Sequence, residues 1–320
     1  MYRILKPLVR LAMLIFCRKI VINQPEVFKE KGPILLACNH PNSFLDAVII
    51  DVLFDQTVWS LARGDVFKNS FYTKLLTALK ILPVYRNSEG VENLGINYET
   101  FESCKKIFHK KGTVQIISEG KCINEWHLRP LKKGTARLAI RSWEENIPLK
   151  VLPVGINYSS FRRFGKNIFL NFGTPITQSD IEWNVADGLR HQSFNVQLQN
   201  QFHQLVYEIE KSDKQKQKEL LKVKISVVKK ILLAIPALVG WLIHAPLYLP
   251  IRQFVYRKTN NNDHFDSIII ALLLFAYPIY LLLITFVLFF ILKSYWIFLL
   301  LLVLPFTAWS YVQVKRQTNR

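Results

Sequence analysis

The stretch that decides the fold is CNHPNSFLDAVIID, residues 38–51. The apolar run before this stretch, Ile34 to Ala37, is typical of a buried strand. The apolar end of the stretch itself, Ala47 to Ile50, is typical of the buried face of a helix. Pro41 disfavours helical geometry at His40, so we expect His40 on the loop after the strand and a helix that begins near Ser43. The sequence therefore predicts a strand, a polar loop and a helix in immediate succession.

Two interpretations of Asp46 remain open from the residues alone. Ser43 and Asp46 have the spacing of a capping box, in which both side chains bind backbone N–H groups at the start of a helix. Alternatively, Asp46 accepts a hydrogen bond from one ring nitrogen of His40, so that the other nitrogen can take a proton. In one continuous helix these two side chains would point about 240° apart. A loop position for His40 lets them meet.

Strand-like and helix-like segments alternate through the first half of the chain. This alternation predicts an α/β fold, a layered domain with a largely buried mixed sheet. Polar residues that follow strand ends fall where such sheets place their sites. After Ile34 to Ala37, strands are expected at 57–62, 81–85, 113–117, 150–156 and 168–172, and helices at 69–79, 92–111, 131–145 and 197–218.

The composition limits the partners. The chain has 320 residues and a formal net charge of +19, from 42 Lys and Arg against 23 Asp and Glu. This balance suits nucleic acid, an anionic membrane surface or phosphorylated substrates. Long apolar segments accompany the charge and no nucleic-acid-binding signature appears, so we expect no nucleic acid partner. The cysteines lack paired or metal-like spacing, which predicts free thiols in a reducing compartment and no metal site: Cys17, Cys38, Cys104 and Cys122.

Residues 1–22 alternate basic and apolar side chains. They lack the uninterrupted apolar core and the small-residue cleavage site of a secretory signal. The pattern favours an amphipathic helix that lies on a membrane surface. The alternative is an ordinary surface helix of the soluble domain.

Three apolar segments close the chain. Residues 267–292 and 294–314 each reach the ~20 positions that cross a bilayer, and only Lys293 separates them, so we expect a transmembrane hairpin. Basic residues flank its outer ends, which the positive-inside rule places in the cytoplasm. Prolines interrupt residues 231–251, for which we favour a re-entrant or interfacial segment. Buried soluble helices are the alternative for all three segments.

These patterns divide the chain into four parts. Residues 1–30 hold the membrane-surface helix, and residues 31–212 form the α/β domain. Residues 213–265 hold a lysine-rich helix and the re-entrant or interfacial segment, and residues 266–320 form the transmembrane helical hairpin. The lysine-rich run is either a solvated face or, as we prefer, a surface attracted to anionic headgroups. We expect a membrane protein with its α/β domain on the cytoplasmic face, at the inner membrane if the source is bacterial.

Further sequence blocks follow Asn39-His40 and Asp46 along the chain. They are ILPVYR at 81–86, SEG at 118–120 and VLPVG at 151–155. In this order the blocks resemble the glycerophospholipid acyltransferase (PlsC-like) superfamily, over residues 34–173. Five residues separate His40 from Asp46 instead of the common four, as in the branch that includes fungal-type glycerol-3-phosphate acyltransferases. Ser118 replaces a usual proline, and Lys121-Cys122 replaces a usual Thr-Arg or Thr-Ser, so Lys121 offers a cation where a hydroxyl is missing.

The resemblance implies a membrane acyltransferase. It would transfer a fatty acyl group from acyl-CoA or acyl-carrier protein to a hydroxyl of glycerol-3-phosphate or 1-acyl-glycerol-3-phosphate. His40 would act as the general base, Asp46 would orient its ring, and Arg86 would bind the acceptor phosphate with its planar fork. No cofactor or metal is implied, because the acyl thioester is itself a substrate. The other expected substrate-binding residues are Asn42, Glu119, Gly120, Lys121, Arg129 and Lys132.

Other interpretations stay open at this stage. The acceptor is alternatively a lyso-aminolipid or another lysophospholipid. The same His and Asp would also serve a membrane-anchored lipid hydrolase, and a non-catalytic lipid-binding protein would need neither. Among the proposed site residues, the alternatives are a surface turn position for Arg86, an ion pair with a lysine for Glu119, and simple solvation for Lys132. Anionic membrane lipids are expected partners in each case.

Overall fold

A computed structural model describes residues 1–67, 69–85 and 94–317. Within these residues, seven strands form one sheet in the order β1-β7-β6-β2-β5-β3-β4. Strands β6 and β7 are antiparallel, whereas the other neighbouring pairs are parallel. This mixed sheet confirms the predicted α/β fold. The strands are β1 (Cys17–Ile22), β2 (Ile34–Cys38), β3 (Val58–Arg63), β4 (Ile81–Val84), β5 (Thr113–Ile117), β6 (Lys150–Tyr158) and β7 (Lys166–Phe172).

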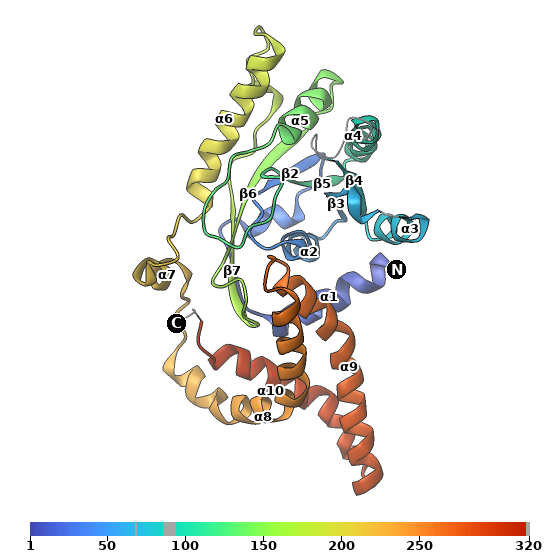
Figure 1. Cartoon of the computed structure of the whole chain (residues 1–320), viewed down its shortest axis with the longest axis vertical. Helices are drawn as coiled ribbons and strands as arrows, with labels where there is room; N and C mark the ends of the chain where they lie inside the picture. Colours follow the sequence, from blue (N-terminus) through green and yellow to red (C-terminus); the bar gives the residue numbers. More distant parts are fainter. Residues whose placement is uncertain (68, 86–93, 318–320) are drawn as a thin grey trace.

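Helices cover both faces of the sheet (Figure 1). Every residue of β2 is buried, and its side chains alternate between two hydrophobic cores, with Leu36 in one and Leu35 in the other. This double burial explains why the strand is apolar throughout. The helices are α1 (Tyr2–Phe16), α2 (Phe44–Leu53), α3 (Ser70–Ala78), α4 (Leu94–His109), α5 (Gly134–Glu144), α6 (Asp187–Leu205), α7 (Lys214–Leu221), α8 (Val227–Lys258), α9 (Phe265–Leu292) and α10 (Leu300–Val314).

Two helix predictions are wrong at their ends. The N-terminal helix stops at Phe16, and residues 17–22 form the edge strand β1, which pairs with β7. The helix predicted at 197–218 is interrupted after Leu205, where α6 ends. Ile209 instead donates its backbone N–H to the carbonyl of Trp126, 2.9 Å away, and α7 begins only at Lys214. A backbone hydrogen bond to a distant residue thus overrides helical periodicity at this point.

The amphipathic character of α1 is visible in the structure. Its side chains Met13 and Phe16 are buried against the sheet domain, whereas an apolar stripe remains exposed: Ile4, Leu8, Leu11 and Leu14. An exposed apolar stripe on a helix with basic residues fits a membrane interface. The contact with a membrane stays a prediction.

Among the described residues, three C-terminal helices have the length and composition to cross a membrane: Val227–Lys258, Phe265–Leu292 and Tyr295–Val314. Helix α8 is continuous through Pro236, Pro246 and Pro250. It packs along α10, where Gly240 brings the two backbones together. The turn between α8 and α9, residues 259–264, reaches α2 in the sheet domain (Figure 1). The re-entrant or interfacial placement of residues 231–251 stays a prediction.

Candidate active site

A cavity of about 1560 Å³ opens where the parallel strands β2, β3, β4 and β5 end. Its lining includes His40 and Ser43 from the loop after β2, and residues 118–122 from the loop after β5. One part of the lining is apolar: Phe44, Leu61, Val66, Leu76, Ile81 and Phe101. Another part is basic: Lys121, Arg129, Lys132, Lys133, Arg137 and Arg141. Loops at the carboxyl ends of parallel strands are the usual place for a site in such a sheet.

His40 lies on the loop after β2, as predicted, and its Nδ1 is 2.8 Å from Oδ2 of Asp46 in the first turn of α2. The capping box is absent, because the Ser43 side chain makes no capping hydrogen bond. Asp46 Oδ2 also accepts the backbone N–H of Asn42, and its Oδ1 accepts the hydroxyl of Tyr158 at 2.7 Å. The carboxylate is fully buried and is surrounded by three hydrogen-bond partners.

This geometry defines what the pair can do. An ionised carboxylate accepts from Nδ1–H and so leaves Nε2 of His40 as the basic ring nitrogen. Because His40 lines the cavity, Nε2 is available to a bound molecule. The arrangement can therefore remove a proton from a hydroxyl that binds there.

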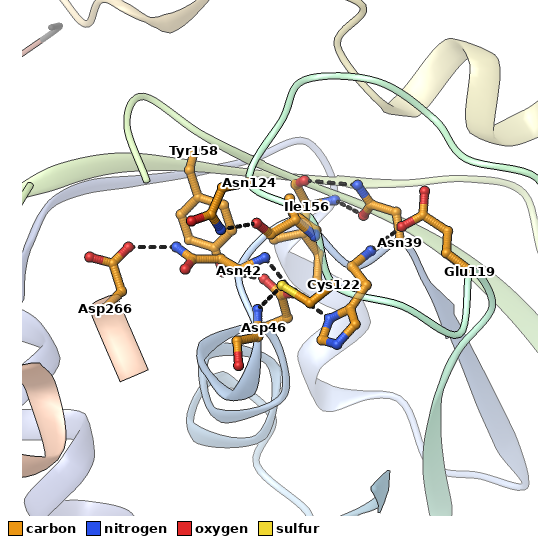
Figure 2. Close-up of polar contacts among 12 residues, drawn as sticks. Asn39, Asn42, Asp46, Glu119, Cys122, Asn124, Ile156, Tyr158 and Asp266 are labelled. Carbon is orange, nitrogen blue, oxygen red and sulfur yellow. Dashed lines mark hydrogen bonds and ion pairs between the residues drawn. The ribbon is translucent and has the colours of Figure 1, made fainter. Parts of the chain in front are cut away.

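The neighbouring asparagine fixes the start of the loop. Asn39 donates its side-chain amide to the carbonyl of Ile156, and its side-chain oxygen accepts the backbone N–H of the same residue (Figure 2). The carboxamide thus continues the β2–β6 pairing one position beyond the strand. It holds the backbone at the point where the chain turns toward His40.

The loop after β5 holds the other side of the His40 loop (Figure 2). The side chain of Asn124 donates to the carbonyl of Pro41, and the Cys122 sulfur accepts the backbone N–H of Ser43. Burial raises the pKa of the Cys122 thiol, so it stays protonated. The backbone N–H of Ser43 is thus occupied within the protein.

Glu119 is almost completely buried and contacts two backbone amides. Its Oε2 accepts the N–H of His40 at 2.6 Å, and its Oε1 accepts the N–H of Arg129 at 2.8 Å. No ion pair to a lysine is present for this carboxyl among the described residues. Burial raises its pKa to about 7, against the opposing effect of these hydrogen bonds. Glu119 thus holds the backbone of the site in place.

The predicted cationic residues divide into two groups. Lys121, Arg129 and Lys132 all line the cavity, and Arg129 also pairs with Glu125 at 3.1 Å. Arg86 lies outside the described residues. Basic residues that were not among the predicted ligands also line the cavity, including Lys133, Arg137 and Arg141.

The predicted residues Gly120 and Asn42 have different surroundings. Gly120 lines the cavity with a positive φ of 68°, a conformation that favours glycine. Asn42 is fully buried and is absent from the cavity lining. Its side-chain amide donates to Asp266 at the start of α9, 2.6 Å away (Figure 2). Direct contact between Asn42 and a substrate stays a prediction.

Sequence reasoning missed Tyr158 and Asp266. Tyr158 ends strand β6, and burial together with Asp46 raises its pKa well above the ordinary value, so the phenol is a reliable donor. A polar residue at the end of a fully buried strand was the available signal. Asp266 gave a weaker signal, since it stands next to the expected span as an ordinary first-turn acid.

Comparison with known proteins adds the family. The model of the family described as Acyltransferase matches residues 19–157, which include β2, α2, His40, Asp46 and Glu119. This segment of the chain is therefore similar to an acyltransferase domain. The predicted resemblance is thereby confirmed for the domain that contains the cavity.

Two relatives extend the comparison. The chain is similar to glycerol-3-phosphate O-acyltransferase 2 of Saccharomyces cerevisiae, with 28% identity over 170 residues. That match covers 48% of this chain and only 22% of the yeast protein. A solved structure, the 1-acyl-sn-glycerophosphate (LPA) acyltransferase PlsC of Thermotoga maritima, aligns with 16% identity and a TM-score of 0.41. It covers 60% of this chain and 74% of its own.

Proposed function

We propose that this protein transfers a fatty acyl group from acyl-CoA or acyl-carrier protein to a hydroxyl of glycerol-3-phosphate or 1-acyl-glycerol-3-phosphate. The observation that carries the proposal is the His40–Asp46 pair on a cavity with one apolar part and one basic part. The apolar part suits an acyl chain, and the basic part suits a phosphate. The yeast relative, named as a glycerol-3-phosphate O-acyltransferase, supports the same class of acceptor.

In the proposed reaction, Nε2 of His40 takes the proton of the acceptor hydroxyl. At the same time the hydroxyl oxygen bonds to the carbonyl carbon of the thioester. The carbon–sulfur bond then breaks, and the imidazolium returns the proton to the departing thiolate. Asp46 keeps the proton of the neutral ring on Nδ1 and stabilises the imidazolium. Such a general base contributes roughly 10²- to 10⁴-fold to the rate.

The acceptor phosphate is expected among the basic residues of the cavity. Lys121, Arg129 and Lys132 are the proposed ligands within the described residues. Phosphate binding by Arg86, which lies outside the described residues, stays a prediction. Cations of both kinds suit a phosphate, because lysine supplies a compact charge and arginine a bidentate fork.

The reaction is proposed to occur at a membrane, with the α/β domain on the cytoplasmic face. Three long apolar helices and the exposed stripe of α1 support this location. Anionic lipids are the proposed partners of the lysine-rich run at 211–230. The proposed chemistry needs no metal or redox cofactor, since a thioester is already activated for acyl transfer.

The test uses the purified full-length protein in detergent with one labelled acyl thioester. Acceptors offered separately are glycerol-3-phosphate, 1-acyl-glycerol-3-phosphate, a lyso-aminolipid and lysophosphatidylcholine, and mass spectrometry identifies the products. We expect ester formation only with the phosphorylated glycerol acceptors. Free fatty acid without any acceptor would instead indicate a hydrolase. A product only with the lyso-aminolipid would show that the acceptor is a lyso-aminolipid and not a phosphorylated glycerol.

The variant His40→Ala separates catalysis from binding. We expect loss of at least ~10²-fold in rate, because the general base is removed, with an unchanged melting temperature. His109→Ala, at an exposed position at the end of α4, is the matched control and should keep full activity. Full activity of His40→Ala would contradict the mechanism.

A further inference from the structure

The turn between α8 and α9 meets the loop that carries His40. The hydroxyl of Ser43 is 2.6 Å from Nδ1 of His264, and the amide of Asn42 is 2.6 Å from Oδ2 of Asp266. His264 and the three residues before it line the same cavity as His40. A segment of the predicted membrane region thus forms part of the wall of the candidate active site.

The turn is attached to the sheet domain by charged groups. Asp266 forms an ion pair with Lys166 of β7, and both side chains are fully buried. Arg162, from the loop between β6 and β7, donates to the carbonyl and the hydroxyl of Thr259. These contacts place the start of α9 against the acyltransferase domain at a defined position.

A buried ion pair adds little net stability, because desolvation of both charges offsets their attraction. A helix that served only as an anchor would be held as well by apolar side chains at this point. The retained pair instead sets an orientation, since each buried charge must meet its partner. The group that the pair orients is Asn42, whose side-chain amide donates to the same Asp266 carboxylate.

Asn42 passes this orientation to the catalytic pair. Its side chain binds Asp266, while its backbone N–H donates to Asp46 Oδ2, the same oxygen that binds His40. A shift of Asn42 therefore moves one of the three donors that hold the Asp46 carboxylate. Small displacements of this kind change catalytic rates strongly, by as much as ~10²-fold for 1 Å.

We propose that Asp266 is a positioning residue of the active site, which holds the His40–Asp46 pair in place through Asn42. The turn at 259–264 is then a component of the catalytic cavity as well as a membrane connection. This inference rests on the proposed function for its kinetic readout. It assigns to the C-terminal helices a part in catalysis beyond attachment.

The test compares two double variants of the full chain in detergent micelles. Lys166→Met with Asp266→Asn removes both buried charges and keeps an oxygen that accepts from Asn42. Lys166→Met with Asp266→Leu also removes both charges but leaves the Asn42 amide without its acceptor. Both are assayed with glycerol-3-phosphate, an acceptor that needs no membrane, after their melting temperatures have been measured.

We expect the leucine variant to have a kcat at least ~10-fold below that of the asparagine variant, with similar KM for the acyl thioester. Asp187→Asn, an acid-to-amide change in the first turn of α6, is the control and should match wild type. Equal kcat in the two double variants would overturn the inference. A difference that merely follows the folded fraction would overturn it as well.

A second readout needs no turnover. The ring of His40 is followed by NMR across a pH titration, with its signals assigned from the spectrum of His40→Gln. A changed tautomer population or titration midpoint in the leucine variant alone supports the positioning role. Identical titrations in both double variants overturn it. If wild type transfers no acyl group to any acceptor, the proposed function fails while this readout still decides the inference.

Discussion

At the scale of single residues, the hydroxyl of Tyr158 is the donor that holds Oδ1 of the buried Asp46. Tyr158→Phe removes it and leaves that oxygen without a partner, at a cost of about 1–3 kcal/mol. We expect kcat for acyl transfer to fall roughly 10-fold with little change in KM. Tyr207→Phe, at a tyrosine that packs on Phe169, is the control. An unchanged kcat in Tyr158→Phe would show that the other two donors suffice.

Glu119 gives a pH-dependent prediction at the same scale. Burial raises its pKa from an ordinary value near 4.5 to about 7, so the folded state holds its proton more tightly than the unfolded state. Its contribution to the free energy of unfolding is therefore largest at low pH and is lost as pH rises toward 7, by ~3 kcal/mol at most.

Denaturant unfolding of wild type and Glu119→Gln at several pH values between about 5 and 8 checks this slope. Glutamine cannot titrate, and it leaves one of the two backbone N–H groups without an acceptor, which adds a constant offset. The stability of wild type relative to Glu119→Gln should fall with rising pH. A difference that is constant across this range would contradict the raised pKa.

Nearby positions in the sequence predicted the His40–Asp46 contact, whereas distant partners stayed hidden. His40 and Asp46 are close in the chain, and the proline between them predicts the loop that lets them meet. Tyr158 bonds Asp46 from 112 positions away, and Asp266 accepts from Asn42 from 224 positions away. Local patterns give only weak signals for such partners, because tertiary packing brings them together. The bond from Asn42 to Asp266 was hidden for the same reason, since this buried partner belongs to α9.

At the scale of elements, the packing of α8 on α10 depends on Gly240. A Cβ atom at this position would lie 2.2 Å from the carbonyl oxygen of Thr307, so Gly240→Ala must push the two helices apart. We expect a loss of about 1–3 kcal/mol, seen as a lower melting temperature in detergent. Gly188→Ala, in a helix where a Cβ has open space, should be neutral or slightly stabilising. Equal melting temperatures in both variants would contradict the close helix contact.

The elements that sequence patterns predicted well are the strands buried on both faces and the long apolar helices. Their signals are continuous and hard to mistake. Strand β1 was missed because Arg18 implied a surface helix. The guanidinium is in fact buried, where it donates to the carbonyls of Val312 and Gln313 at the end of α10. A helix terminus with unpaired carbonyls offers such a partner only in the folded state.

At the scale of the whole molecule, both ends of α8 are linked to the α/β domain, the start through α10 and the end through the turn that follows it. Near the start of α8, Lys229 donates to Gln313 of α10, and Gln313 donates to the carbonyl of Arg18 in β1. The end of α8 is followed by the turn that meets α2. We therefore expect residues 259–264 on the same side of the membrane as the cavity. The turn at Lys293, between α9 and α10, should face the opposite side.

Cysteine labelling measures this topology. Asn261→Cys and Ser294→Cys are introduced separately and treated with a membrane-impermeant maleimide in intact and permeabilised cells. We expect labelling at position 294 in intact cells and at position 261 only after permeabilisation. Wild type, whose native cysteines are mostly buried, is the background control. Equal labelling of both positions in intact cells would contradict the arrangement.

The mixed lining of the cavity also has a kinetic consequence under the proposed function. A long-chain reactant that enters from the lipid phase arrives by lateral diffusion, so the rate depends on its mole fraction among the surrounding lipids and not on its molarity in the assay tube. Inert detergent added at constant total substrate would then slow the reaction by surface dilution. Water-soluble glycerol-3-phosphate would still saturate the enzyme according to its bulk concentration. The rate would therefore depend on the mole fraction of one reactant in the lipid phase and on the molarity of the other in water.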